Sequence, residues 1–170
     1  MPALLASLLW FASEGAVAPI SSPGPRALHR MRSRLAALDV GDKRIGVAVS
    51  EGLRLTAQPL GTVERRSLAA DCAAIDTMLA SYEIEKVIAG LPLNLRGEEG
   101  EQADRVRHFC ARFEKETGRQ VEFQDERLTT AQGDRMLIES GMRRKRRREV
   151  RDRVAAALIL QSWLDAQPAS

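Results

Sequence analysis

Two acidic residues stand directly after predicted strands, where α/β proteins collect their functional groups. Asp39 follows the apolar run 35–38, and Glu126 comes just after a predicted strand at 121–124. In an open α/β sheet, ligands and catalytic groups lie beyond the carboxyl ends of the strands. Each acid taken alone also fits a structural role, as a turn-forming Asp or a helix-flanking Glu. Their shared placement makes both of them candidates for a catalytic site.

A third acid, Asp152, lies on the last predicted helix among apolar residues. It shares one face of that helix with Ala155, Ala156, Ile159 and Trp163. Because that face is expected to point inward, the carboxylate is costly to bury unless it is paired or binds a cation. The alternative is a first-turn Asp that favours the helix dipole, with Arg151 and Arg153 screening its charge.

Three carboxylates without an accompanying base fit a site for Mg²⁺ or Mn²⁺, which prefer oxygen ligands. Two such ions about 4 Å apart activate a water and stabilise the leaving oxygen in phosphodiester cleavage. The sequence offers no nucleophile–base arrangement and no metal-binding histidine pair. Cys72 and Cys110 lack CxxC spacing, which excludes a disulfide scaffold and a zinc site and favours a reducing, cytoplasmic setting.

The positive charge of the chain is concentrated around Asp152. Residues 142–153 carry a net charge of +6, so the other residues sum to −3 although the whole chain is +3. A local basic patch on an otherwise slightly acidic protein indicates one polyanion partner. Phosphate binding there would bring a nucleic-acid backbone to the acids, although such runs also occur in solvated or targeting segments. The run consists of Arg143, Arg144, Lys145, Arg146, Arg147 and Arg148.

The elements that must position these residues alternate along the chain. Apolar segments predict strands at 35–38, 45–49, 58–63, 86–90 and 121–124. Capping residues and apolar spacing predict helices at 68–79, 101–117, about 130–140 and about 149–166. This order predicts an α/β fold whose mixed central sheet combines an antiparallel meander with parallel strands, flanked by helices. The 170 residues fit one domain, and no apolar run approaches the length of a membrane-spanning helix, so we expect no membrane partner.

Residues 1–33 differ from the body of the chain at 34–167. The segment 18–26 is typical of a linker, and no Lys or Arg precedes the apolar stretch 4–11 as a signal peptide would require. Met31 stands just before the first predicted strand, so translation from that residue would omit the leader. We expect residues 1–33 to be dispensable; an added amphipathic element and a targeting segment are the alternatives.

Four motifs in order resemble those of the YqgF family, also called RuvX, of ribonuclease H-like pre-16S rRNA nucleases. They are the segments 39–50 (DVGDKRIGVAVS), 90–94 (GLPLN), 125–130 (DERLTT) and 152–156 (DRVAA). The resemblance covers about residues 34–165 and implies a ribonuclease H-like fold. The family's catalytic and metal-binding acids correspond to Asp39, Glu126 and Asp152. The family also carries a basic loop at 143–148, and the further candidate contacts to nucleic acid within the motifs are Lys43, Arg44, Asn94 and Arg127.

The resemblance implies a cytoplasmic, metal-dependent nuclease that trims the 5′ end of pre-16S rRNA, with a ribosomal precursor particle as a further partner. A Holliday-junction resolvase acting on branched DNA is the alternative, because such enzymes share this fold and metal chemistry. A non-catalytic RNA-binding module is the third hypothesis, and it holds if Asp152 lies away from the other acids. The segment 39–41 also resembles the first phosphate loop of actin-like ATPases, but one domain is too short for that fold. We expect a monomer or a weak homodimer. We also expect the carboxylates of Asp39, Glu126 and Asp152 to converge within about 8 Å.

Overall fold

The computed structural model describes residues 33–127 and 144–167, with the side chains of its last helix described from Val154 onward. Five strands form one sheet in the order β3-β2-β1-β4-β5. Their bounds are β1 (Arg34–Val40), β2 (Arg44–Ser50), β3 (Ala57–Glu64), β4 (Ile84–Leu91) and β5 (Val121–Asp125).

The sheet is mixed, as the sequence predicts. Strands β1, β2 and β3 form an antiparallel meander, whereas β4 pairs parallel to β1 and β5 pairs parallel to β4. The parallel strands are reached through α2 (Leu68–Leu79) and α3 (Glu101–Thr117). Because β1, β4 and β5 run in one direction, their carboxyl ends meet at a single edge of the sheet.

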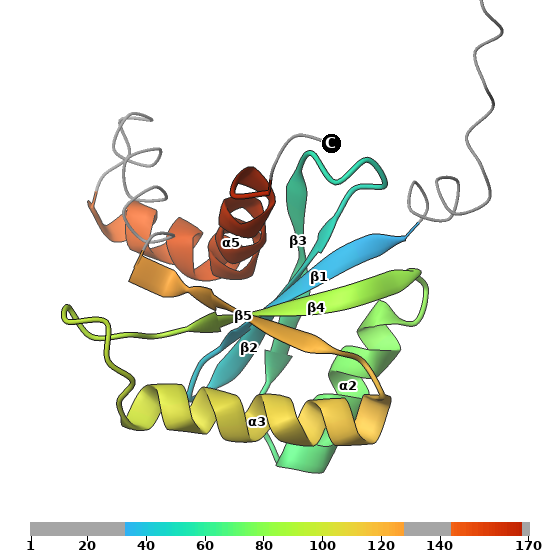
Figure 1. Cartoon of the computed structure of the whole chain (residues 1–170), viewed down its shortest axis with the longest axis horizontal. Helices are drawn as coiled ribbons and strands as arrows, with labels where there is room; N and C mark the ends of the chain where they lie inside the picture. The colour runs from blue at the N-terminus through green and yellow to red at the C-terminus, as the bar shows by residue number, and fades with distance from the viewer. Residues whose placement is uncertain (1–32, 128–143, 168–170) are drawn as a thin grey trace, which may run out of the picture.

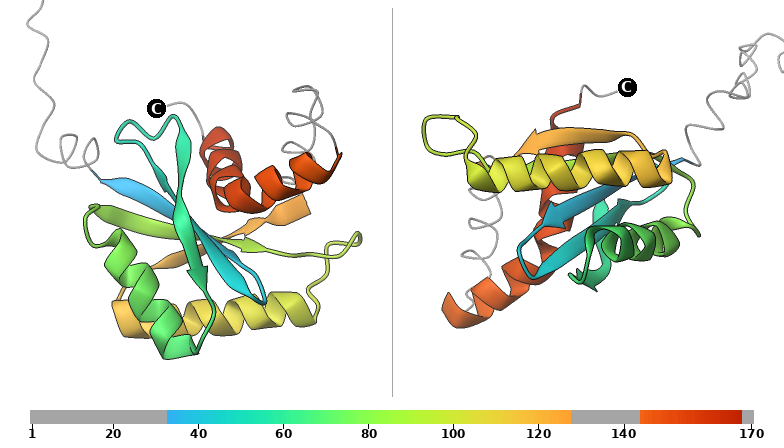
Figure 2. Two further views of the ribbon diagram at one scale, coloured as in Figure 1. Left: turned by 180° about the vertical axis from the view of Figure 1, so that it is seen from behind. Right: turned by 90° about the horizontal axis from the view of Figure 1, so that it is seen from below.

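Helices cover both faces of this sheet. Figure 1 and the two views of Figure 2 place α2 and α3 on one face and α5 (Arg144–Asp165) on the other. The side chains of β1 alternate accordingly. Ala36 and Leu38 pack in the cluster with α2 and α3, and Leu35 and Ala37 pack in the cluster with α5. The period of two in the strand sequence thus assigns each β1 residue to one helical layer.

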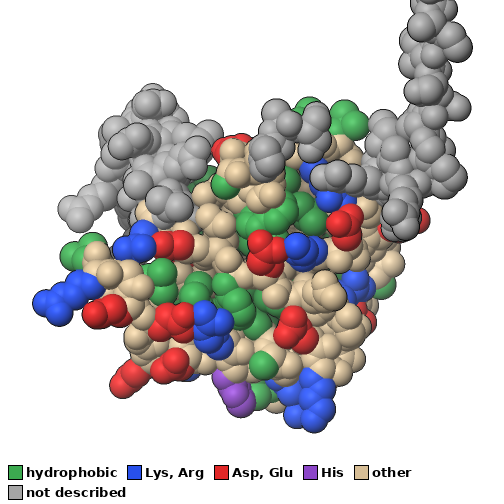
Figure 3. All heavy atoms as spheres, viewed as in Figure 1, with side chains coloured by type: hydrophobic (Ala, Val, Ile, Leu, Met, Phe, Trp, Pro, Cys, Tyr) green, Lys and Arg blue, Asp and Glu red, His purple; other side chains and the backbone are tan. Residues whose placement is uncertain are grey.

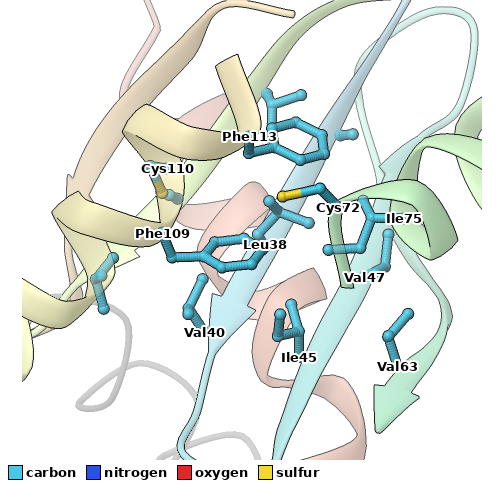
Figure 4. Packing of buried hydrophobic residues seen from close by; sticks show 14 of the residues in the cluster. Leu38, Val40, Ile45, Val47, Val63, Cys72, Ile75, Phe109, Cys110 and Phe113 are labelled. Carbon is cyan, nitrogen blue, oxygen red and sulfur yellow. The ribbon is translucent and has the colours of Figure 1, made fainter. Parts of the chain in front are cut away.

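The larger core lies between the sheet and helices α2 and α3, as Figure 4 shows. The rings of Phe109 and Phe113 stack with their centroids 6.3 Å apart and cover Leu38 of β1. Cys72 and Cys110 are buried in this core as unbridged thiols. Burial raises the pKa of Cys72 to about 11 and that of Cys110 to about 12, so both thiols stay protonated at neutral pH. Both cysteines are therefore small core residues.

Both predicted helix caps are present. Ser67 accepts a hydrogen bond from the backbone N–H of Ala70 and so caps α2. Gly118 ends α3 in the left-handed conformation, with φ of 71°. No helix among the described residues is both long and apolar enough to span a membrane.

The last helix begins earlier than the sequence analysis predicts. It starts at Arg144 rather than near Glu149, so residues 144–148 of the basic run are helical and do not form a loop before the helix. Arg and Lys are good helix formers, and neither Gly nor Pro interrupts this run. The helix predicted at about 130–140, Arg143 and the leader at 1–32 lie outside the described residues.

Side-chain hydrogen bonds attach the second half of α5 to the sheet and to the β2–β3 hairpin. Gln161 Nε2 donates to the carbonyl oxygen of Leu55 at 3.1 Å, and Gln161 Oε1 accepts from the backbone N–H of Ala57 at 3.0 Å. Trp163 Nε1 donates to Glu122 Oε1 at 3.1 Å. These bonds fasten α5 to the β2–β3 hairpin at one end of the sheet and to the edge strand β5 at the other.

Candidate active site

Asp39 and Glu126 lie on the α5 face at the carboxyl edge of the sheet. Asp39 continues the alternation that turns Leu35 and Ala37 toward α5, and it pairs in register with Gly46 of β2. Glu126 directly follows β5, and its side chain lies next to Gly90 of β4 together with Ile159 of α5. The structure therefore brings two of the three predicted acids to the same place.

Gly90 leaves the space that Glu126 occupies. In the parallel register Leu38 pairs with Ala89, so residue 90 is the β4 position beside Asp39. A Cβ atom on residue 90 would lie 2.6 Å from Ile159 Cδ1 and 3.0 Å from Glu126 Cγ. Because β4 separates β5 from β1, only a residue without a side chain lets the Glu126 carboxylate lie over β4 toward Asp39.

Gly46 of β2 shows how closely α5 approaches Asp39, although a side-chain methyl group would fit at this position. A Cβ atom on residue 46 would lie 3.5 Å from both Asp39 Cβ and Ala156 Cβ. Ala156 of α5 therefore passes close to Asp39. Residue 152 stands one turn before Ala156 on the same helix, and residues at i and i+4 share a helix face. The side chain of Asp152 itself lies outside the described part of α5.

The two carboxylates disfavour each other's charge. The pKa of Glu126 is raised to about 7, first by burial, then by the negative charge of Asp39 and then by that of Asp125. Among the described residues, no three His, Cys, Asp or Glu side chains form a metal-binding group. Asp39 and Glu126 supply oxygen donors only, the donor type that suits Mg²⁺ and Mn²⁺. A cation placed between them would remove the repulsion that raises the pKa of Glu126.

Lys43 lies in the turn after β1 and Arg44 is the first residue of β2, and both are exposed at the same edge as the carboxylates. Arg65, just after β3, holds this turn from the opposite face of the sheet. Its Nη1 donates to the carbonyl oxygen of Gly41 at 3.1 Å, and its Nε donates to Asp71 Oδ2 at 3.2 Å. Asp71 is buried in the first turn of α2, with 2% of its surface exposed. The two cations are therefore presented by a turn with a fixed backbone.

Asn94 and Arg127 lie at the carboxyl ends of β4 and β5. The Asn94 amide is bonded within its own loop: Oδ1 accepts from the backbone N–H groups of Arg96 and Glu98, and Nδ2 donates to Glu98 Oε2. Arg127 forms an ion pair with Asp125, with Nη2 and Oδ2 2.7 Å apart. Contacts of these two residues to nucleic acid stay a prediction, and the observed geometry gives Asn94 a role in shaping its loop.

The described part of the basic run lies on the same side of the molecule as these groups. In Figures 1 and 2 the first turns of α5 and the carboxyl ends of β1, β4 and β5 point to one side. The side chains of residues 144–148 lie outside the described part of the structure. Figure 3 shows Lys or Arg and Asp or Glu side chains interleaved over the described part of the face that carries α3 and β5. That face has mixed charge, unlike the run of cations at the start of α5.

The sequence analysis missed the residue that makes room for Glu126. Gly90 carries no chemistry of its own, and Ile159, which packs beside it, is an ordinary apolar residue on a helix. The motif at 90–94 contains Gly90, and the period of two places it on the α5 face. Its part in the site became visible only with the register between β4 and its two neighbours.

Comparison with known sequences identifies the family. A family model described as "RuvX: Holliday junction resolvase" matches residues 33–166. A protein of Myxococcus xanthus (strain DK1622) named "Putative pre-16S rRNA nuclease" is 51% identical over 133 residues, which are 78% of this chain and 88% of that protein. A protein of the same name from Moorella thermoacetica is 49% identical over 132 residues, covering 78% of this chain and 94% of that protein.

Among solved structures, T. thermophilus RuvC in complex with a Holliday junction substrate aligns at 17% identity with a TM-score of 0.47, covering 76% of this chain and 91% of that chain. The mixed sheet, its crossover helices and the two acids at its carboxyl edge define an α/β protein that combines an antiparallel meander with parallel strands, the fold class that the sequence predicts. Within that class, the chain belongs to the RuvX family.

The substitution Gly90→Ala is expected to lower the free energy of unfolding by about 1–3 kcal/mol, because the added methyl group overlaps Glu126 and Ile159. Urea unfolding of variant and wild type at the same pH measures the difference. The same change at Gly61 of β3 is the control, since an added Cβ there would meet only the flexible end of the Met78 side chain. An unchanged stability of Gly90→Ala, or an equal loss at Gly61, would contradict the packing described.

The raised pKa of Glu126 predicts that the metal-free protein loses stability as the pH rises. The carboxyl group binds its proton more tightly in the folded protein, where its pKa is about 7, than at its ordinary value of 4.5. This contribution to stability is complete below a pH of about 4.5 and is lost as the pH passes about 7. Urea unfolding in chelator should therefore vary less with pH for Glu126→Gln than for wild type. Identical pH profiles for the two proteins would refute this assignment.

Proposed function

We propose that this protein is a divalent-metal-dependent nuclease that processes the 5′ end of pre-16S rRNA in the cytoplasm. The observation that carries the proposal is the partly buried pair of Asp39 and Glu126 at the carboxyl edge of the sheet, with the pKa of Glu126 raised by burial and by Asp39. The two neighbouring carboxylates repel each other in the metal-free protein, and a bound cation would neutralise that repulsion. Asp152, one helical turn before Ala156, would supply the third carboxylate.

Each candidate residue has a role that follows from its position in the fold. Asp39 is fixed by strand pairing and Glu126 by the space above Gly90, so both present oxygen ligands with little freedom to move. Because Glu126 holds a proton up to about pH 7, cation binding near neutral pH displaces that proton, and the affinity rises with pH. When bound, Mg²⁺ or Mn²⁺ activates a water and stabilises the leaving oxygen of a phosphodiester. Lys43, Arg44 and the run at 143–148 would hold the phosphates alongside.

The choice of substrate follows from the relatives. Proteins 51% and 49% identical to this chain bear the name of a pre-16S rRNA nuclease, which supports RNA and a ribosomal precursor particle as the target. The description of the matching family model supports the second candidate, cleavage of a four-way DNA junction. Both candidates use the same acids and the same phosphate contacts.

One experiment compares these candidates directly. Labelled RNA carrying the 5′ leader of pre-16S rRNA and a four-way DNA junction are incubated with the protein in Mg²⁺, in Mn²⁺ and in chelator. Metal-dependent cleavage of the RNA supports the proposal, whereas cleavage of the junction alone supports the resolvase. Tight binding of RNA without cleavage in either metal would contradict both and leave a binding module.

The substitution Asp152→Asn tests the third ligand. It keeps the shape of the side chain and removes its charge, so cleavage should fall by orders of magnitude while the metal-free protein is no less stable, because repulsion among the acids is relieved. Cleavage assays and a thermal melt in chelator measure the two effects. Asp165→Asn, at the far end of the same helix, is the matched control and should keep activity. Normal cleavage by the Asp152→Asn protein would show that Asp152 is not a metal ligand. The first-turn role considered from the sequence does not apply, because α5 begins at Arg144 and residue 152 lies in its third turn.

Replacing Arg144, Arg146 and Arg147 with Ala tests the phosphate contacts. Affinity should drop for all nucleic acids, and the slope of log affinity against log salt should flatten by up to about 2–3 units. Stability should hardly change, since Ala favours a helix as well as Arg does. Replacing the exposed pair Arg112 and Lys115 on α3 is the control. A salt slope equal to that of wild type would show that the run has another role.

A further inference from the structure

The segment between β4 and α3 forms a tightly bonded loop. Its residues 94–98 are joined by the backbone bonds from Gly97 N–H to the Asn94 carbonyl, 2.9 Å, and from Asn94 N–H to the Glu98 carbonyl, 3.0 Å. The Asn94 side chain adds bonds to the backbone N–H groups of Arg96 and Glu98. Gly97 completes the turn with φ of 85°, a conformation that favours glycine. These bonds fix the backbone at the loop tip.

The base of this loop is fastened to α3 and β5. Glu99 accepts from Arg107 Nε at 2.6 Å and from Arg107 Nη2 at 2.5 Å, and the Arg107 guanidinium lies 4.5 Å from the centre of the Phe123 ring. On the other side, Arg127 packs on Gly97, where a Cβ atom would lie 3.3 Å from Nη1. The loop is therefore a fixed projection that packs on Arg127, the residue after the candidate catalytic Glu126.

The tip of this loop holds Leu95 in solvent. Leu95 is 100% exposed, whereas the other exposed large apolar side chains of the described residues, Leu53 and Leu55, are 61% and 69% exposed. In Figure 1 the loop is the yellow-green segment that projects past the carboxyl ends of the strands, on the same side as the first turns of α5. Leu53 and Leu55 lie in the β2–β3 hairpin, at the opposite edge of the sheet.

We propose that Leu95 is an apolar wedge that contacts an unstacked base of the nucleic-acid substrate next to the cleavage site. The proposal rests on the proposed function and adds a substrate contact to the same site. Leu is among the residues that proteins insert between bases, and unpaired bases of RNA are held by apolar or planar side chains. A wedge must keep its position against the stacked bases, and the bonds of Asn94 and the anchoring of Glu99 provide that rigidity.

Size favours a base over a protein as the occupant. A protein interface buries about 800 Å² on each partner around several clustered anchors, and Leu95 is a single apolar side chain. Beside it at the tip, Arg96 offers a guanidinium group that can stack on a base or meet a phosphate. The exposed acids that follow are bonded within the loop and its base, because Glu98 accepts from Asn94 and Glu99 accepts from Arg107. Leu95 and Arg96 are therefore the side chains that the tip offers to a base.

The test measures binding of the 5′-leader RNA in chelator, where cleavage is blocked, over a series of salt concentrations. The substitution Leu95→Ser should weaken binding by about 10-fold, the effect of removing one apolar side chain from a buried contact. Because no charge is lost, the slope of log affinity against log salt should stay as in wild type. Leu95→Met should bind as wild type does, and Leu53→Ser, an equally drastic change at the other edge, should have no effect. A 2-aminopurine base scanned along the leader should brighten on binding wild type and less on binding Leu95→Ser.

Each result decides the proposal. Binding by Leu95→Ser equal to wild type would overturn the wedge, as would an equal loss in Leu53→Ser or a loss accompanied by a flatter salt slope. Thermal melts exclude misfolding as the cause, because a fully exposed side chain contributes little to stability. Failure of the wild type to bind or cleave any nucleic acid would instead overturn the proposed function and the wedge with it. Wild-type cleavage together with unimpaired binding by Leu95→Ser would overturn the wedge alone.

Discussion

Asp39 and Glu126 come from strands that are not neighbours, so the strand between them must leave room for their carboxylates. That room exists because residue 90 is Gly and because Ile159 of α5 covers it from above. Every other feature of the site follows from this spacing. Glu126 can lie over β4, Asp39 can face it from β1, and burial by α5 raises the pKa of Glu126. A larger residue at position 90 would push the acids apart and leave the helix no place to pack.

The two faces of the sheet differ in how they are packed. The face toward α2 and α3 holds the large core, with Phe109 and Phe113 packed on Leu38, and supplies most of the buried apolar side chains. The face toward α5 is built from small residues at its carboxyl edge, among them Gly46 and Ala156. The acids therefore stand on the face with the smaller cluster of buried apolar side chains, and the larger cluster lies on the opposite face.

Much of the site could be predicted because its signals are local. Short apolar segments predict the strands, and the rule that functional groups lie beyond strand ends in an open α/β sheet selects Asp39 and Glu126. The role of Gly90 depends on the register among three strands far apart in sequence, which a single sequence does not contain. The sequence predicts too late a start for α5, near residue 149 instead of Arg144. A run of like charges suggests a solvated loop, but Arg and Lys are good helix formers. The sequence predicts that Asn94 contacts nucleic acid. In the structure its side chain instead accepts hydrogen bonds from its own loop, and these depend on a backbone turn that the sequence alone does not specify.

The attachment of α5 has a mechanical consequence. The described contacts of this helix run from Ala156, over position 46, to Trp163, bonded to β5, and Gln161 ties it to the β2–β3 hairpin. Residues 144–153 continue the same helix without a break. Because a helix rises 1.5 Å per residue, residue 152 stands about 6 Å along the axis before Ala156. The bonds that hold the carboxyl half of α5 on the sheet therefore also set the position of the backbone at residue 152.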